Sequence, residues 1–375
     1  MGQLDLFPKE QIGEDDAYLT QQIITYIGNK RSLLPFIGKG LDIVQARLAK
    51  NKLVSLDLFS GSGIVARYLK QYSSLVIAND LENYSRISNL CYLTNKDNVD
   101  FELLKEHQRN LSRKVEGNLS SGFITELYSP RDEANITEVD RCFYTRRNAM
   151  FLDNARQAIE ELPEEIKIYF LGPLLARASV HANTSGVFKG FYKNSEGKGH
   201  FGGTGENALT RILGKIELDI PVLSKFSCDS VVHQGDSNQV IDEIAEVDVA
   251  YLDPPYNQHP YGSNYFMLNL LADYKRPAAT SRVSGIPTNW NRSRYNQKAE
   301  AEAALFELVG KTRAKYILIS YNSEGFISYE SFVSGLERQG KVTVLETSYN
   351  TFRGSRNLRE RAIHVTEYLY LVEKN

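Results

Sequence analysis

The tetrapeptide Asp253-Pro254-Pro255-Tyr256 is the segment of this chain best suited to chemistry. It ends the apolar run Val247 to Leu252, which is typical of a buried parallel strand, and open α/β sheets place ligands at the carboxyl ends of such strands. Two successive prolines remove two backbone donors and stiffen the turn, which would fix the Asp253 carboxylate and the Pro254 carbonyl as adjacent acceptors. This arrangement suits holding an amino group of a flat ring, although an ordinary turn would explain the tetrapeptide if it stood alone.

A glycine-rich turn is predicted upstream. The apolar run Leu53 to Phe59 predicts a strand, and Ser60-Gly61-Ser62-Gly63 connects it to a helical pattern from Ile64 to Tyr72. Glycines at such a turn let the backbone approach a ligand and aim helix amides at it. A further predicted strand, Leu75 to Asp80, ends in an acid where Rossmann-type sheets place the acceptor for ribose hydroxyls. These two elements alone would also fit a nicotinamide or flavin enzyme. That interpretation would leave the tetrapeptide unexplained.

Three segments follow one another in the order of a known family. Tyr26-Ile27-Gly28-Asn29-Lys30-Arg31, Phe59-Ser60-Gly61-Ser62-Gly63 and the tetrapeptide resemble the N-terminal motif, the cofactor loop and the catalytic motif of DNA adenine-N6 methyltransferases. The similar class is deoxyadenosine-methylase-like, with alpha-group motif order, and uses S-adenosylmethionine. The resemblance runs from Tyr26 to the C-terminus. It implies an α/β fold, with a Rossmann-like methyltransferase sheet and a mostly helical inserted target-recognition domain.

The resemblance also implies roles for single residues. Asp253 and the Pro254 carbonyl would accept N–H bonds from the target amino group, Pro255 would fix the turn, and Tyr256 would stack on an adenine flipped out of the duplex. Lys30 would meet the methionine carboxylate of the cofactor. The residues expected to bind the cofactor are Tyr26, Lys30, Phe59, Gly61, Gly63, Asp80, Asp236 and Asp253.

Asp236 has two explanations from its own pattern. It follows a predicted strand and opens the helical run Ser237 to Ile244. By resemblance it would meet the adenine amino group of the cofactor. A helix N-cap explains an aspartate at this position equally well.

Composition favours a cytoplasmic enzyme with room for a sizeable core, since 42% of the 375 residues are hydrophobic. No apolar run approaches the roughly 20 residues of a membrane span, so no membrane partner is expected. Cys91, Cys142 and Cys228 are read as reduced thiols, and the six histidines show no metal pattern. The net charge of −2 does not by itself indicate a nucleic-acid binder. Lys275 to Lys315, however, holds nine lysines and arginines against three glutamates, and local basic faces can engage phosphates.

The order of the predicted strands indicates a discontinuous domain. After about Asn95 the pattern is mostly helical, with glycine-rich interruptions. Strand patterns return at Ser230–His233, Val247–Leu252, Tyr316–Ser320, Val342–Leu345 and Val365–Val372. The predicted organisation is an N-terminal tail (1–18), a catalytic domain (19–95 and 215–375) and an inserted target-recognition domain (96–214).

Two segments of the insertion are expected to contact DNA. Tyr144 to Ala149 leads into a helical pattern, Phe151 to Leu162, so its arginines could lie at a helix start near phosphates or guanines. His181 to Lys193 mixes small polar, aromatic and basic residues, which suits a loop that enters between bases. A solvated helix end and a structural turn are the respective alternatives.

Two segments outside the insertion complete the expected DNA surface. Tyr261 to Phe266 begins a helix that would shape the flipped-base pocket. Arg353 to Arg361 is basic and could clamp phosphates, or it could be a solvated hairpin loop. The residues expected to bind DNA are Arg146, Arg147, Asn183, Ser185, Lys189, Tyr261, Tyr265, Arg353 and Arg356.

The N-terminal peptide offers a separate hypothesis about a protein partner. Gln3, Leu4, Leu6 and Phe7 match the short pattern of peptides that dock on the bacterial sliding clamp, although a plain disordered tail is an equal explanation. A cognate restriction endonuclease is a second possible partner.

Three functions remain open from the sequence. The leading hypothesis is site-specific adenine-N6 methylation of double-stranded DNA, within a restriction-modification system. Methylation of cytosine N4, RNA or a protein amide is the alternative enzyme function. A catalytically silent DNA-recognition subunit is the third, and the intact Lys30, Gly61, Asp80 and Asp253 argue against it.

Overall fold

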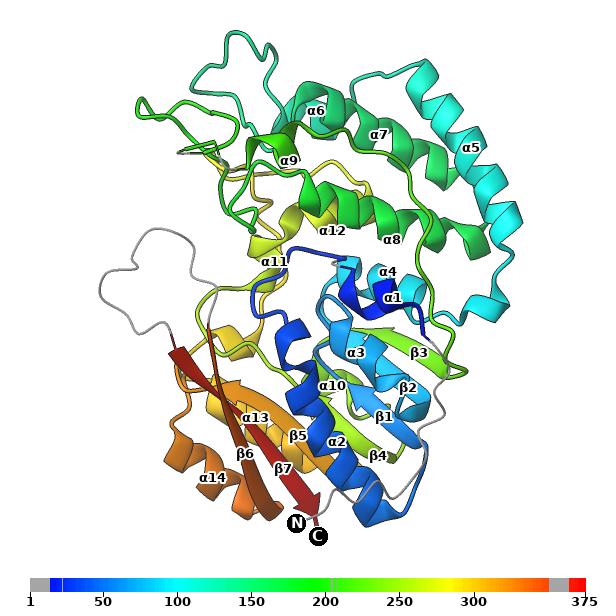
Figure 1. Ribbon diagram of the computed structural model, residues 1–375. Coiled ribbons are helices and arrows are strands. Elements are labelled where there is room, and N and C mark those ends of the chain that lie inside the picture. The colour runs from blue at the N-terminus through cyan, green and yellow to red at the C-terminus, as the bar shows by residue number, and fades with distance from the viewer. Residues whose placement is uncertain (1–13, 22, 204, 207, 351–363) are drawn as a thin grey trace.

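The computed structural model describes residues 14–21, 23–203, 205–206, 208–350 and 364–375 (Figure 1). Seven strands in this part of the chain form one mixed sheet in the order β3-β2-β1-β4-β5-β7-β6. Strands β1 to β5 run parallel, and β7 is antiparallel to both of its neighbours. The strands span β1 Leu53–Asp57, β2 Ser73–Asp80, β3 Asp229–Gln234, β4 Val247–Leu252, β5 Ala314–Asn322, β6 Gly340–Asn350 and β7 His364–Lys374.

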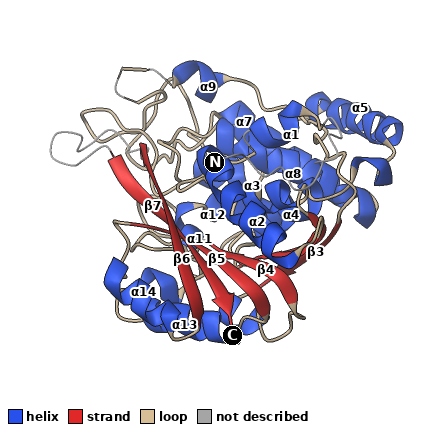
Figure 2. Ribbon diagram, turned by 60° about the horizontal axis from the view of Figure 1, so that its bottom comes forward, coloured by secondary structure: helices blue, strands red, loops and turns tan. Residues whose placement is uncertain are grey.

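Each predicted strand is present in this sheet, which is the α/β fold expected from the sequence. Alternate residues of the central strands serve opposite faces. Val249 and Tyr251 of β4 pack in a cluster with α2 and α3, whereas Ala250 and Leu252 pack with α10, α13 and α14. Because both faces are covered, the strands are apolar without alternation. Figure 2 shows the two groups of helices on either side of the sheet. The helices next to the sheet are α1 Asp16–Thr20, α2 Leu34–Leu48, α3 Ile64–Leu69, α10 Ser237–Val240, α13 Ala301–Lys311 and α14 Tyr329–Glu337.

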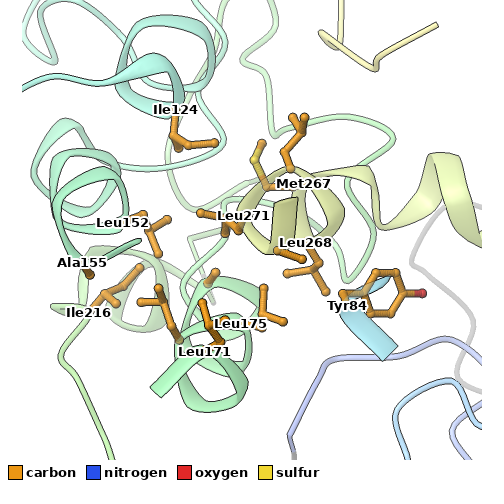
Figure 3. Close-up of a cluster of buried hydrophobic side chains, with 14 of the residues drawn as sticks. Tyr84, Ile124, Leu152, Ala155, Leu171, Leu175, Ile216, Met267, Leu268 and Leu271 are labelled. Carbon is orange, nitrogen blue, oxygen red and sulfur yellow. The ribbon is translucent and has the colours of Figure 1, made fainter. Parts of the chain in front are cut away.

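A second, helical layer lies over one end of the sheet (Figure 1). Its core includes residues far apart in the sequence, such as Tyr84, Ile124, Leu152 and Leu271 (Figure 3). Part of it therefore comes from outside the predicted insertion 96–214. The helices of this layer and its border are α4 Asn83–Tyr92, α5 Phe101–Gly117, α6 Phe123–Tyr128, α7 Arg146–Glu160, α8 Glu164–Val180, α9 Leu209–Leu213, α11 Tyr261–Asn264 and α12 Phe266–Asp273.

The last residues of the expected tail 1–18 are packed against the body. Asp15 caps α1 by accepting from the Ala17 amide, and Tyr18 is 1% exposed. The Tyr18 hydroxyl donates to the Tyr92 carbonyl at 2.6 Å, which fixes α1 against α4. Residues 1–13, including the peptide Gln3 to Phe7, lie outside the described residues. None of the described helices is long and apolar enough to cross a membrane.

Candidate active site

The two predicted motifs meet where the strand order of the sheet reverses. Strand β1 pairs with β4, with Asp57 opposite Tyr251, and the Leu58 amide donates to the Tyr251 carbonyl at 3.2 Å. The chain leaves β1 towards β2 on one side, whereas β4 continues the sheet on the other. Open α/β sheets bind ligands at such a switch point. The cofactor loop, residues 59–63, and the tetrapeptide therefore lie side by side.

The tetrapeptide presents its carboxylate on the wall of a pocket. Asp253 Oδ1 accepts from Lys30 Nζ at 3.0 Å, and Oδ2 accepts no hydrogen bond from any described residue. The Lys30 side chain is 4% exposed and the Asp253 side chain 19%. Pro255 lines the same pocket, and the Tyr256 ring packs edge-on against Tyr321. Among the described residues, Lys30 therefore engages one oxygen of this carboxylate and the other has no donor.

The cofactor loop needs glycine at two positions. Gly61 and Gly63 have φ values of +52° and +76°, which are in the left-handed region. A Cβ on Gly61 would lie 2.8 Å from the Tyr26 ring, and one on Gly63 would lie 2.9 Å from Asn89. The Gly61 amide donates to Asp80 Oδ2 at 2.7 Å. The carboxylate at the end of β2 therefore braces the loop as well as lining the pocket.

The pocket is lined by residues from several distant segments. Those predicted from the sequence are Tyr26, Phe59, Asp80, Asp236, Asp253, Pro255 and Tyr261. Asp236 also caps α10, because its carboxylate accepts from the Asn238 amide at 2.9 Å. Both explanations given for Asp236 therefore agree with its position. Lys30 lies behind Asp253, against a second carboxylate described below.

Sequence reasoning missed other lining residues. Glu82 lies two positions after Asp80, so its place just beyond a predicted strand could have indicated that it lines the pocket. Its Oε2 accepts from Asn269 and, at 3.0 Å, from Asn291. The segment 290–296 does not follow a predicted strand, so no sequence pattern indicated it. It lies at the pocket only because of tertiary contacts. The missed residues that line the pocket include Glu82, Asn291, Ser293, Tyr295 and Asn296.

Burial raises the pKa values of the carboxyls around this pocket. It raises the pKa of Asp253 to about 6 despite the neighbouring Lys30, and that of Asp80 to about 6. The pKa of Glu82 rises to about 7 for the same reason. The pKa of Asp57, at the end of β1, lies well above its usual value because of burial and nearby carboxylates. Such shifts are typical of functional sites.

Three tyrosines close one side of the site. The Tyr26 ring stacks on Tyr261 at 4.9 Å and on Tyr265 at 4.7 Å between ring centroids. Tyr265, predicted to contact DNA, has no exposed surface, and its hydroxyl accepts from the Ile27 amide at 2.7 Å. That prediction needs correction, because a buried and hydrogen-bonded ring is not available to DNA. Tyr265 instead fixes the N-terminal motif on the helical layer.

Asn183, predicted to read DNA, is also a structural residue. It is fully buried, and its Nδ2 donates to the carbonyls of Cys142 and His200 at 2.8 and 3.0 Å. Its Oδ1 accepts from the Gly202 amide at 3.2 Å. With its amide group engaged in the protein, Asn183 has nothing left with which to read a base edge.

The remaining predicted DNA residues differ in availability. Arg146 is half-buried and donates to Ser121 Oγ at 3.2 Å, so it holds a neighbouring loop. Arg147 is half-buried, and its buried Nη1 has no hydrogen-bond partner among the described residues. Ser185 and Lys189 are exposed. Arg353 and Arg356 lie outside the described residues.

The part of the chain with described coordinates contains no cluster of histidine, cysteine or acidic side chains able to hold a metal ion. Its three cysteines are free and buried.

The fold and site together are those of an α/β methyltransferase. Residues 26–334 match the D12 class N6 adenine-specific DNA methyltransferase family. The chain belongs to this family.

Individual relatives are similar over nearly the whole chain. The type II methyltransferase M.NlaIII of Neisseria lactamica is 31% identical over 94% of this chain and 99% of its own length. The type II methyltransferase M.CviAII of Paramecium bursaria Chlorella virus 1 is 28% identical over 93% of this chain and 98% of its own. The type II methyltransferase M.FokI of Planomicrobium okeanokoites is 27% identical over 93% of this chain, which spans 52% of that longer protein.

The cofactor loop gives a test of its backbone strain. Gly61→Ala should lower the free energy of unfolding by about 1–2 kcal/mol or more, because a Cβ is disfavoured at this φ and would meet the Tyr26 ring. Urea titration would measure the loss. Gly117→Ala is the matched control, since its Cβ would meet no atom within 4 Å, and it should leave stability unchanged or higher. Equal losses of stability in the two variants would contradict the requirement for glycine at position 61.

Proposed function

We propose that this chain transfers the methyl group of S-adenosylmethionine to the N6 amino group of an adenine flipped out of double-stranded DNA. The observation that carries the proposal is the position of the Asp253 carboxylate. It lies at the switch point of the sheet, on the wall of a pocket, and no described residue donates a hydrogen bond to its Oδ2. Family membership supports adenine in DNA over cytosine, RNA or a protein amide as the substrate.

The chemistry of the pocket fits a nucleoside cofactor that carries positive charge. S-adenosylmethionine supplies a methyl group activated by a positive sulfur. Asp80, Glu82 and Asp236 line the pocket and offer acceptors for ribose hydroxyls and an adenine amine. Gly61 and Gly63 give the loop beside the pocket its left-handed turns, because a Cβ at either position would meet Tyr26 or Asn89. The Phe59 and Tyr295 rings, 5.1 Å apart and at 84° to each other, supply an apolar wall for a purine.

The residues of the tetrapeptide act on the target amino group. The adenine nitrogen is a poor nucleophile because its lone pair is delocalised into the ring. Hydrogen bonds from its two N–H groups to Asp253 Oδ2 and the Pro254 carbonyl favour the pyramidal nitrogen that develops in the transition state. These two acceptors would orient the lone pair towards a methyl donor held in the pocket. The donor would leave as a neutral thioether, and Asp253 Oδ2 could take the proton that the methylated nitrogen loses. Tyr256 stacks on the flipped base.

Aspartate at position 253 gives a test of the chemical step. Asp253→Ala should lower methyl transfer by about 10²-fold or more while the cofactor still binds, because the lost acceptor acts mainly in the transition state. Tritiated S-adenosylmethionine with genomic DNA from a strain lacking methyltransferases measures transfer, and calorimetry measures binding. Retention of more than about a tenth of the wild-type rate would contradict this mechanism.

The same residue predicts a pH dependence. The pKa of Asp253 is raised by burial to about 6, and only the ionised carboxylate keeps both of its oxygens as acceptors, Oδ1 for Lys30 and Oδ2 for the target amine. At saturating cofactor, which already engages Asp80 and Glu82, kcat/KM for DNA should therefore decline as the pH falls through about 6, about tenfold per unit below the pKa of Asp253. An unchanged kcat/KM down to pH 4.5, with the protein still folded, would assign the acceptor role elsewhere.

DNA contacts are proposed for an open groove beside the tetrapeptide. The groove is adjacent to Pro260, and Arg292 stacks over the Trp290 ring at 4.3 Å from the ring centroid. Lys189, an exposed residue of the predicted insertion, also lines this groove. Cations bind phosphates and an aromatic face can stack on a base, so the groove suits the strand that flanks the target adenine. Its lining residues, called the Trp290 groove, are Lys189, Pro260, Ser263, Ser281, Ile286, Pro287, Thr288, Trp290 and Arg292.

Salt dependence distinguishes the contributions of the groove. Lys189→Ala and Arg292→Ala should each weaken DNA binding and reduce the slope of log K against log salt by about 1, since each cation releases counterions. Trp290→Ala should weaken binding by about 1–3 kcal/mol without changing the slope. Fluorescence anisotropy with a labelled duplex measures both. Lys105→Ala on α5, which removes an exposed lysine paired with Glu102, is the control. If Lys189→Ala and Arg292→Ala both keep the wild-type slope of log K against log salt, the DNA binds outside the Trp290 groove.

The biological setting is also a proposal. The relatives named as type II methyltransferases support a modification role paired with a restriction endonuclease. Docking of Gln3, Leu4, Leu6 and Phe7 on a sliding clamp stays a prediction, as do the domain limits 1–18, 19–95 with 215–375, and 96–214. Arg147, Ser185 and Tyr261 stay proposed DNA contacts, together with Arg146, Arg353 and Arg356.

A further inference from the structure

A buried glutamate on β7 lies behind the active site. Glu367 has no exposed surface, and the residues on the same face of β7 are the apolar Val365, Leu369 and Leu371. Their alternation predicts a further apolar side chain at position 367. An isolated carboxylate is strongly disfavoured in such surroundings, so this residue needs a partner of opposite charge.

Lys30 is that partner, and it is shared. Its Nζ lies 3.4 Å from Glu367 Oε1 and 3.0 Å from Asp253 Oδ1. Ser320 of β5 also donates to Glu367 Oε1, at 2.6 Å, which fixes the carboxylate on the sheet. Glu367 Oε2 is buried and accepts no hydrogen bond from any described residue. Asp253, Lys30 and Glu367 are called the buried charge cluster below.

The sharing has two consequences for the catalytic carboxylate. A lysine held by Glu367 from behind reaches only Oδ1 of Asp253, which leaves Oδ2 for the adenine amino group. The negative charge of Glu367 also offsets the field of Lys30 at Asp253. A carboxylate that faces an unshared ammonium would hold its proton more weakly and accept hydrogen bonds less strongly.

We propose that Glu367 is a positioning residue for methyl transfer, which holds Lys30 so that Asp253 keeps one free and strongly accepting oxygen. The inference rests on the proposed function and deepens it. It assigns a role in catalysis to the antiparallel strand β7, whose residues do not line the pocket.

The direction of the expected pH effect follows from the charges. Lys30 lowers the pKa of Asp253, whereas burial and Glu367 raise it. Removing the charge of Glu367 therefore lowers the pKa of Asp253. The groups that face Asp253 are Lys30, Glu367, Asp57 of β1, Tyr251 of β4, Tyr256 and Tyr261.

Glu367→Gln is the test, because it keeps the shape and removes the charge. The acidic limb of kcat/KM for DNA, measured at saturating cofactor so that Asp80 and Glu82 are already engaged, should move to lower pH by about one unit. The rate above the limb should fall on the order of tenfold, because Lys30 is then free to engage both oxygens of Asp253. The assay uses full-length protein, tritiated S-adenosylmethionine and genomic DNA from a strain lacking methyltransferases.

Two comparisons separate positioning from a general structural role. Glu373→Gln makes the same change on the same strand, at a partly exposed residue paired with Arg47, and should leave both the limb and the rate unchanged. Glu367→Asp keeps the negative charge but moves it away from Lys30, because the side chain is shorter. The rate should therefore fall, while the acidic limb of the pH profile moves less than in Glu367→Gln. A lower rate in Glu367→Gln with an unmoved limb would overturn the proposal.

A second background covers the case in which Glu367→Gln does not fold. Lys30→Met leaves Glu367 buried without its cation, so adding Glu367→Gln should restore stability. If Glu367 acts only through Lys30, the added change should leave the residual rate as it is in Lys30→Met. A further loss of rate would overturn the proposal. Wild-type protein without transfer activity would instead refute the proposed function, so the two failures are distinguishable.

Discussion

The contact between the Lys30 ammonium and the Asp253 carboxylate is the interaction on which the site depends. Lys30 precedes α2, Asp253 ends β4 and Glu367 lies on β7, so three distant parts of the chain meet at one buried cation. Burying these charges is costly unless each has a partner, and the cost is offset only in the folded arrangement that brings them together. The same contact therefore joins the N-terminal motif to the ends of the central strands and lowers the pKa of the Asp253 carboxyl, against the larger effect of burial.

Sequence patterns predicted the sheet well because its strands are apolar and sharply bounded. β4 was expected at Val247–Leu252 and occupies those residues, and the parallel order then placed the cofactor loop beside the tetrapeptide. Helix ends were less accurate, since α10 ends at Val240 rather than Ile244. The helix expected from Tyr261 is broken at Tyr265, whose ring is held between the N-terminal motif and the helical layer.

The site was predictable where its residues follow strands and hidden where tertiary contacts bring them in. Asp80 ends a strand, Asp236 and Asp253 come just after one, and all three line the pocket. Tyr295 comes from an irregular segment with no period, and Glu367 occupies a position that its strand pattern assigns to an apolar residue. For Asn183 the sequence was misleading. A polar residue in a loop resembles a DNA contact, but the amide group of Asn183 donates to backbone carbonyls inside the protein.

The shared core of the helical layer limits how recognition could be exchanged between relatives. Helix α12 begins ten residues after Tyr256, and its Met267, Leu268 and Leu271 are buried among helices of the insertion. A graft of residues 96–214 alone would cut through this core and leave mismatched side chains on α4 and α12. An exchange of residues 96–214 between relatives would therefore have to carry 261–273 as well, so the smallest exchangeable unit includes the helix that follows the tetrapeptide.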